Sequence, residues 1–179
     1  RTDPYACLVV GDAESRDTIV DVFVDVYHPD GSFKYQMHAT KLDPVVDEQE
    51  IRDCLADGVA AGLITPEQAS DDPDDPAAPS HIGYNIFSQP NWYMYKVPLP
   101  MYYHQPSGDY EVRGYATDDR SRMSVPLPRW FTWVAGTYLE LDFSTVDFGS
   151  IQPGAWKRVN GDLVMGTALA PTLKNEGNT

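Results

Sequence analysis

The sequence predicts a mainly β protein: an antiparallel β-sandwich with a short helical insertion, followed by a partial second β module. The 179 residues include 15 prolines and 13 glycines, a composition that favours many short strands joined by turns. The chain also contains 11 tyrosines and four tryptophans, and aromatic side chains suit pleated surfaces. The hydrophobic fraction of 42% is high enough for a packed core, so the chain is not expected to be disordered.

The first strands are the easiest to recognise. Residues 6–10 form an apolar run long enough for one strand. Residues 18–28 (TIVDVFVDVYH) alternate with a period of two, which is typical of a half-buried strand and places Val20, Val22, Val24 and Val26 on one face. The segment Pro-Asp-Gly-Ser at 29–32 predicts a turn. Residues 33–42 then return as the second strand of a hairpin.

A helical insertion is expected at about residues 43–79. Acidic residues at its start complement the helix dipole, and Ile51, Cys54, Leu55 and Val59 follow the spacing of an amphipathic helix. Gly62 is placed to end this helix. Thr65 followed by Pro66 predicts the start of a second, short helix, and an acidic loop follows.

Three further strands complete the predicted sandwich. Residues 91–103 are aromatic and β-prone, but Pro98 and Pro100 indicate an edge or kinked strand because proline cannot donate to a ladder. Residues 110–116 and 125–134 supply the other two strands. The order of hairpin, insertion, hairpin and closing strand is that of an immunoglobulin-like (Ig-like) antiparallel β-sandwich, which we assign to residues 1–135.

Residues 136–179 predict an incomplete β module. Apolar residues alternate from Tyr138 to Phe148, and two further β-rich runs follow at 155–164 and 172–174. These are about three strands, whereas an Ig-like sandwich needs about seven. The apolar faces and strand edges therefore need a cover, which could be the preceding domain, a continuation of the chain or another copy of the protein.

The charge balance excludes some classes of partner. With 27 acidic and 13 basic residues the formal net charge is −14, which argues against binding to nucleic acid or to anionic lipid. No apolar run of about 18 residues is present, so no transmembrane segment is expected. The sequence starts at Arg1 without a signal core, which is expected of an exported, processed protein or of an excised segment.

The two cysteines allow two interpretations. Cys7 and Cys54 could form one disulfide across a long loop, as an exported protein would permit. They could also be two buried thiols that pack as small hydrophobic side chains. No CxxC motif or Cys/His ligand cluster is present, so the sequence lacks zinc and haem signatures.

Several turn-and-strand motifs resemble those of known extracellular modules. Residues 26–31 (VYHPDG) and 108–118 (GDYEVRGYATD) resemble the pattern of Ig-like and PKD-like modules, and residues 141–154 with 174–178 are similar to the opening strands of another Ig-like family. The whole arrangement resembles archaeal cell-surface proteins, including those of methanogens. This resemblance implies a sheath, filament or surface-layer (S-layer) protein. The sequence departs from the second family because it stops before that module is complete.

The chemistry-bearing residues are few. No catalytic constellation stands out, and the serines lie in no GxSxG context, so we expect no enzyme activity. Calcium is the one cofactor considered, since it is bound by carboxylates gathered in loops, although the EF-hand spacing is missing. The alternative is that the acidic loops at residues 71–75 and 118–119 are solvated and bind no ion. The candidate calcium ligands are Asp71, Asp72, Asp74, Asp75, Asp118 and Asp119.

Two functions remain open at this stage. The first is a structural subunit of an extracellular, cell-surface assembly that polymerises with copies of itself by exchange of β-strands. The second is a carbohydrate- or cell-wall-binding module whose aromatics around Trp92 stack on sugars, although the same aromatics could pack the sandwich or a subunit contact. The predicted interface residues are Leu139, Leu141, Phe143, Val146, Phe148, Trp156, Trp92, Tyr93 and Tyr95.

Overall fold

A computed structural model describes residues 4–11, 18–102, 105–167, 170–175 and 177. The chain divides into two compact units, which are described separately below. The first unit comprises Arg1–Met101 and Tyr110–Phe131, and the second comprises Tyr102–Asp109 and Thr132–Thr179. The division therefore falls a few residues before the boundary at 135/136 that the sequence suggested.

The protein is mainly β, with antiparallel strand pairs in two main sheets, as in a β-sandwich. One sheet has three strands, in the order β1 (Tyr5–Gly11), β5 (Trp92–Pro98) and β4 (Thr40–Lys41). The other has four strands, in the order β3 (Phe33–His38), β2 (Ile19–Tyr27), β6 (Gly108–Asp118) and β7 (Leu127–Trp133). Neighbours in these sheets are often distant in the sequence, so connections cross from one sheet to the other.

The predicted hairpin is present as β2 and β3. Tyr27 pairs with Phe33, and Gly31 in the turn between the strands has φ 81°, a conformation that glycine adopts without steric cost. Val22, Val24 and Val26 are fully buried, as their alternation indicates. Val20 is exposed instead, because a register irregularity between Ile19 and Asp21 interrupts the pairing with β6 at this end.

Strand β5 corrects one prediction. The prolines suggested an edge or kinked strand, but β5 lies at the centre of the three-stranded sheet, between β1 and β4. Pro98 is its last residue and Pro100 lies beyond it, so neither proline removes a hydrogen bond from the middle of the ladder. The strand is buried on both faces: Met94 packs toward the helices, and Tyr93 and Tyr95 pack with Val22 of the other sheet.

The insertion contains four short helical elements. The sequence predicted the first two, which are α1 (Glu48–Ala60) and α2 (Pro66–Ala69). Gly62 follows α1 with φ 68°, and Thr65 and Gln68 form a capping box at α2. The 3-10 turn η2 (Ala78–Ser80) and the helix α3 (Ile82–Ser88) extend the insertion beyond residue 79. The sequence did not predict α3, since its seven residues are too few for a clear periodic pattern.

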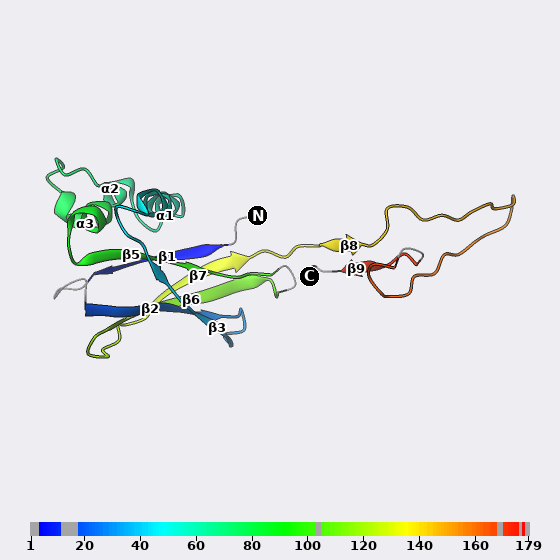
Figure 1. Cartoon of the computed structure of the whole chain (residues 1–179), viewed down its shortest axis with the longest axis horizontal. Coiled ribbons are helices and arrows are strands. Elements are labelled where there is room, and N and C mark those ends of the chain that lie inside the picture. Colours follow the sequence, from blue (N-terminus) through cyan, green and yellow to red (C-terminus); the bar gives the residue numbers. More distant parts are fainter. Residues whose placement is uncertain (1–3, 12–17, 103–104, 168–169, 176, 178–179) are drawn as a thin grey trace. The chain divides into compact units, whose positions relative to one another are not determined.

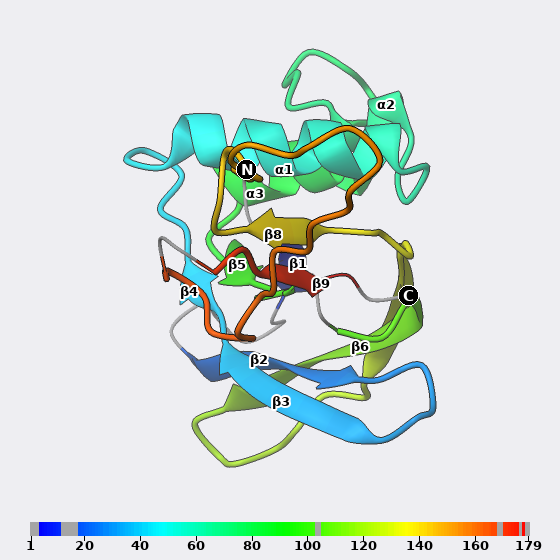
Figure 2. The same ribbon diagram turned by 90° about the vertical axis from the view of Figure 1, so that its right-hand side faces the viewer.

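Two apolar layers hold the first unit together. One lies between the helices and the three-stranded sheet, and the other lies between the two sheets (Figures 1 and 2). The helices cover one face of the three-stranded sheet, and the four-stranded sheet covers its opposite face. The buried residues of the first layer are Leu42, Ile51, Cys54, Leu55, Ile86 and Met94.

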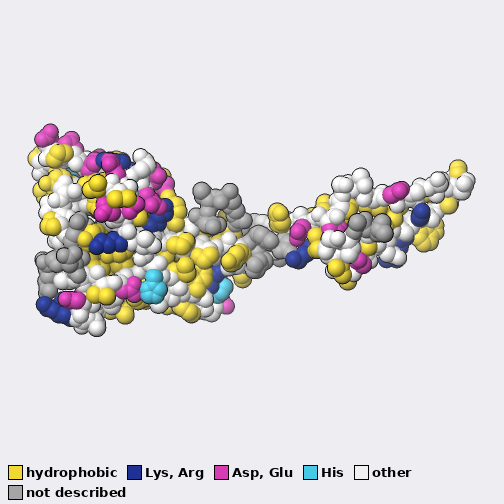
Figure 3. Space-filling view, viewed as in Figure 1, with side chains coloured by type: hydrophobic (Ala, Val, Ile, Leu, Met, Phe, Trp, Pro, Cys, Tyr) yellow, Lys and Arg dark blue, Asp and Glu magenta, His cyan; other side chains and the backbone are white. Residues whose placement is uncertain are grey.

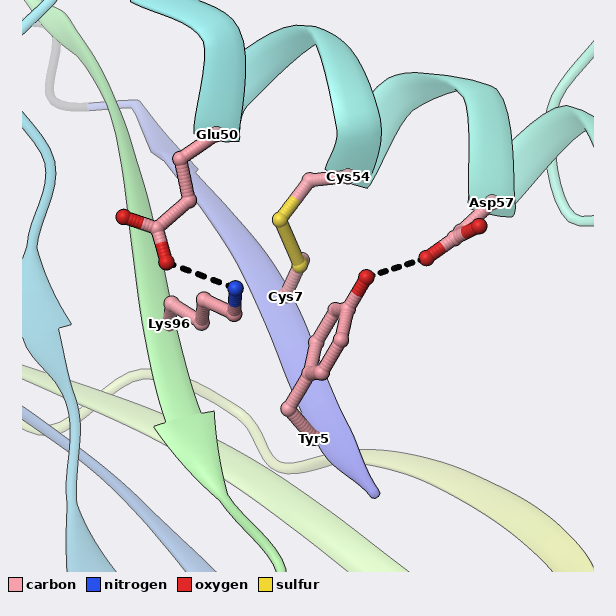
Figure 4. The surroundings of a disulfide bond; sticks show 6 residues. All are labelled: Tyr5, Cys7, Glu50, Cys54, Asp57 and Lys96. Atoms are coloured by element: carbon pink, nitrogen blue, oxygen red, sulfur yellow. Dashed lines mark hydrogen bonds and ion pairs between the residues drawn. A yellow bond between two sulfur atoms is a disulfide. The ribbon is translucent and has the colours of Figure 1, made fainter. Parts of the chain in front are cut away.

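A disulfide fastens the helical layer to the sheet. Cys7 of β1 and Cys54 of α1 are bonded, 47 residues apart in the sequence (Figure 4). Two polar contacts flank the bond: Lys96 Nζ lies 2.6 Å from Glu50 Oε1, and the Tyr5 hydroxyl donates to Asp57. The hydrogen bond to Asp57, together with burial, raises the pKa of Tyr5 to about 12. One covalent bond and two polar contacts therefore join α1 to β1 and β5.

The second unit contains β8 (Leu139–Leu141) and β9 (Leu173–Asn175), which form a two-stranded antiparallel sheet. We predicted a third strand at residues 155–164, but this prediction is wrong, because the residues there form no ladder. Apolar composition alone does not make a strand, since the backbone groups also need a partner strand. Leu163 has φ 64°, which is incompatible with an extended run through this segment.

The disulfide provides a first test of this architecture. Opening the Cys7–Cys54 bond should lower the free energy of unfolding by about 4 kcal/mol, because the unfolded chain regains the entropy of a loop of this length. Denaturant unfolding with and without dithiothreitol measures the difference. The double variant Cys7→Ser, Cys54→Ser is the control and should not respond to the reductant. Equal unfolding midpoints of the native protein with and without reductant would contradict the expectation.

Candidate functional site

The β8–β9 ribbon of the second unit has one apolar and one polar face. Leu139 pairs with Asn175, Glu140 with Lys174, and Leu141 with Leu173. Because paired residues lie on the same face and faces alternate along a strand, the three leucines share one face and the Glu140–Lys174 pair lies on the other. Leu139, Leu141 and Leu173 are 50%, 53% and 57% exposed. The apolar face of the ribbon is thus only half covered.

The second unit has no apolar core among its described residues. Thr172 is the single buried residue there. Of the predicted interface residues in this part of the chain, Phe143 and Val146 are half-buried, and Leu139, Leu141, Phe148 and Trp156 are exposed. A two-stranded sheet without a packed face is at best marginally stable in water. Additional exposed apolar side chains are Ile151, Leu163 and Val164.

Polar contacts take the place of a core in this unit. The carboxylate of Asp142 accepts the N–H of Thr172 at 2.8 Å and that of Gly166 at 3.2 Å. The carboxylate of Asp162 accepts the N–H of Val164 at 3.0 Å and the hydroxyl of Thr172 at 3.2 Å. We call Asp142, Asp162 and Thr172 the polar clasp. The clasp ties the long connection between β8 and β9 to the ribbon and leaves the leucine face uncovered.

The polar clasp depends on the ionised form of the Asp162 carboxylate. The N–H of Val164, followed by the hydroxyls of Thr167 and Thr172, holds the pKa of Asp162 below its usual value. A carboxyl whose pKa is lower in the folded state contributes stability above its unfolded pKa, and this contribution is lost as the pH falls through the folded pKa. The contacts of Asp162 in the clasp are therefore complete at neutral pH and weaken in acid.

Two of the aromatic residues near Trp92 are enclosed within the first unit. Tyr93 and Tyr95 are buried between the two sheets, where Lys41 Nζ lies 3.3 Å from the centre of the Tyr93 ring. Burial, the largest cause, raises the pKa of Tyr95 to about 12. Trp92 is half-buried. Both tyrosine rings are enclosed, so they can neither stack on a sugar nor contact another subunit.

The six candidate calcium ligands lie in two separate turns. Asp71 pairs with Arg52 at 2.8 Å, and Asp118 pairs with Arg122 at 2.5 Å. The carboxylates of Asp72 and Asp75 accept backbone N–H groups two residues further along the chain. The remaining candidates, Asp74 and Asp119, have backbone N–H groups that donate to Asp72 and to Thr18. Within the described ranges, no three His, Cys, Asp or Glu side chains are grouped to hold a metal ion. Asp71 and Asp118 therefore pair with arginines, and the carboxylates of Asp72 and Asp75 stabilise turns.

Sequence reasoning missed one exposed apolar strip. Met123, Val125, Leu127 and Trp130 are 58%, 88%, 58% and 62% exposed, on the approach to β7 and in β7 itself. The sequence predicted a strand here but not that its apolar residues would be exposed. The sequence does contain a sign of this exposure. The apolar residues are irregularly spaced, and Pro126 and Pro128 lie among them, so the alternation of a half-buried strand is disrupted.

Comparisons with known proteins give no assignment: no family model, no curated protein and no solved structure matches this chain. Among the residues that the structure describes, no helix has both the length and the apolar character needed to cross a membrane.

The polar clasp can be tested by removing Asp142. In Asp142→Ala, amides of the ribbon and of Thr172 should exchange with solvent at least tenfold faster, because hydrogen bonds to a charged group contribute about 1.5–3 kcal/mol. Hydrogen exchange followed by mass spectrometry measures the effect. Asp147→Ala is the matched control, since Asp147 accepts only the nearby N–H of Gly149. Equal exchange in the two variants would refute the role of the clasp.

Acid should release the clasp at Asp162. The amide chemical shift of Val164, whose N–H donates to Asp162, should change between pH 7 and pH 2 with a midpoint below about 3.9, the ordinary pKa of aspartate, when it is followed by NMR. In Asp162→Asn this transition should be absent, because the amide does not titrate in this range. A midpoint at or above the ordinary value would show that the carboxylate is not held by these donors.

Proposed function

We propose that this protein is a structural subunit of an extracellular assembly, such as a filament, sheath or surface layer, in which neighbouring copies complete each other's β-structure. One observation carries the proposal: the second unit presents an apolar ribbon face and, in its described part, has no apolar core of its own. A surface of this kind is characteristic of a contact site rather than of a free surface.

Covering the leucine face of the ribbon would contribute free energy to assembly. Full burial of a leucine side chain is worth about 1.5–3 kcal/mol, so covering three half-exposed leucines contributes about 3 kcal/mol. Strands β8 and β9 are each other's neighbours in a two-stranded sheet, which another strand can extend. An element that supplies both a strand and an apolar face therefore stabilises the ribbon more than either feature would alone.

A second copy of the chain is a natural source of such an element. The first unit contains sheets with open edges, and the second unit contains the incomplete ribbon, so each copy carries both halves of the contact. In such an assembly, two different surfaces of identical subunits meet. The contact forms a closed ring only if the rotation between neighbouring subunits closes. Otherwise the contact repeats and produces a fibre or layer.

Two further features agree with an extracellular structural role. A disulfide between β1 and α1 suits an oxidising compartment. The two sheets of the first unit and their crossing connections are compatible with an Ig-like module. The sequence motifs resemble Ig-like modules of archaeal surface proteins.

The proposal predicts that the leucine face controls assembly. In Leu141→Ser the assembled fraction at a given protein concentration should fall at least severalfold, because the neighbour would bury a hydroxyl in place of an apolar side chain. Sedimentation velocity and negative-stain electron microscopy measure the change. Leu63→Ser is the matched control, since Leu63 is about equally exposed but lies after α1. If the Leu141 and Leu63 variants assemble alike, or if the unchanged protein is monomeric at all concentrations, the proposal is wrong.

A further inference from the structure

The proposed assembly needs an acceptor on the neighbouring copy, and the two main sheets offer four outer strands. These are β1 and β4 in the three-stranded sheet and β3 and β7 in the four-stranded sheet. Strand β4 has only two residues, too few to template an added strand. The other three differ in the apolar surface that they present.

Strand β7 has the most exposed apolar surface of these edges. On β1 the only large apolar side chain that is well exposed is Val9, and on β3 it is Phe33. On β7 Leu127 and Trp130 are exposed, and Met123 and Val125 precede them. We call these four residues the β7 strip. Phe131 stacks on buried Tyr110 at 5.5 Å, so alternation directs its neighbour Trp130 to the opposite, outer face of the sheet.

Charge also favours the β7 strip. Of the 27 acidic residues, 11 lie in residues 43–88. The same range contains one arginine, Arg52, one histidine, His81, and no lysine. In the face shown in Figure 3 these acidic side chains gather over the helices. Residues 120–134 contain three arginines and no acidic residue, although Arg122 pairs with Asp118. Since residues 136–179 contain five acidic and three basic residues, they are repelled by the helical layer more strongly than by the strip.

The backbone of β7 fits the same role. Proline within a strand is confined to edges and bulges, which agrees with the place of Pro128 in an outer strand. Because Pro128 cannot donate a hydrogen bond, an added strand has to find its hydrogen-bond donors elsewhere along β7. Trp130 lies in the same strand and supplies the kind of aromatic anchor that dominates many interfaces.

We infer that the open edge of β7, with Met123, Val125, Leu127 and Trp130, receives the β8–β9 ribbon of a neighbouring copy. The inference rests on the proposed function and adds the acceptor surface to it. The ribbon extends the four-stranded sheet of the neighbour beyond β7, and its leucine face lies on the same side of the extended sheet as Trp130. Because donor and acceptor are different surfaces, each copy can give one ribbon and receive another.

Cysteine cross-linking of the full-length protein tests the contact directly. Lys174→Cys places a thiol on the polar face of β9, and Arg129→Cys places one at an exposed position of β7 on the face opposite Trp130, where the polar face of an added ribbon would lie. The two variants are mixed in equal amounts and oxidised with the native disulfide intact, and linked dimers are identified by non-reducing electrophoresis and mass spectrometry. The matched control replaces Arg129→Cys by Gln36→Cys, which lies exposed on β3 at the other edge of the same sheet. The Arg129 pair should give at least severalfold more linked dimer than the Gln36 pair.

A second measurement compares anchors of equal exposure. Trp130→Ala should raise the concentration needed for assembly about tenfold or more, as loss of an interface tryptophan typically does. Phe33→Ala on β3 should leave this concentration unchanged, although Phe33 is 58% exposed and Trp130 is 62% exposed.

Each outcome has a definite meaning. Linked dimers through Arg129→Cys and loss of assembly in Trp130→Ala support the inference. Assembly of the unchanged protein with no preference for Arg129→Cys, or with equal effects of the two alanine variants, overturns the β7 acceptor and leaves the proposed function in place. Absence of assembly in the unchanged protein overturns both.

Discussion

A two-stranded ribbon is stable in water only when another layer covers its apolar face, and this requirement governs the second unit. Two paired strands satisfy each other's backbone groups on one side only, and they cannot enclose side chains between them. In the described part of the second unit, the leucines of β8 and β9 have no facing layer and only Thr172 is buried. The polar clasp gives the connection between the strands a defined course, but hydrogen bonds from an aspartate do not remove a leucine from water. The missing layer therefore has to come from outside this unit.

The first unit solves the same problem completely. Its three-stranded sheet is covered on one face by the helices and on the other by the four-stranded sheet, and β5 at its centre contributes to both layers. The disulfide and its flanking contacts fasten the helices to β1 and β5. The sandwich therefore has its own core, and what it leaves open are strand edges. A stable body with open edges and a ribbon without a core are complementary features, and together they favour a structural role.

The predictions that succeeded were those that depend on local rules. The hairpin of β2 and β3 followed from alternating valines and a Pro-Asp-Gly turn, and α1 and α2 followed from an apolar stripe, a glycine and a Thr-Pro cap. The failures involved pairing between distant segments. The edge assignment of β5 failed because Pro98 lies at the end of the strand, and the strand at 155–164 failed because no partner lies beside it. The assignment of Tyr93 and Tyr95 to an accessible aromatic surface failed because periodicity cannot distinguish a ring that faces another sheet from a ring that faces solvent.

The sequence by itself determined the mainly β class, the helical insertion, the first hairpin and the strands near residues 139 and 173, because turns, caps and alternation are properties of neighbouring residues. Only the tertiary structure decided that Tyr93 and Tyr95 are enclosed, that Cys7 meets Cys54, and that Trp130 is exposed on an outer strand. The physical reason is that burial depends on which segments meet across the fold. A residue has the same sequence neighbours whether a second sheet covers it or water does.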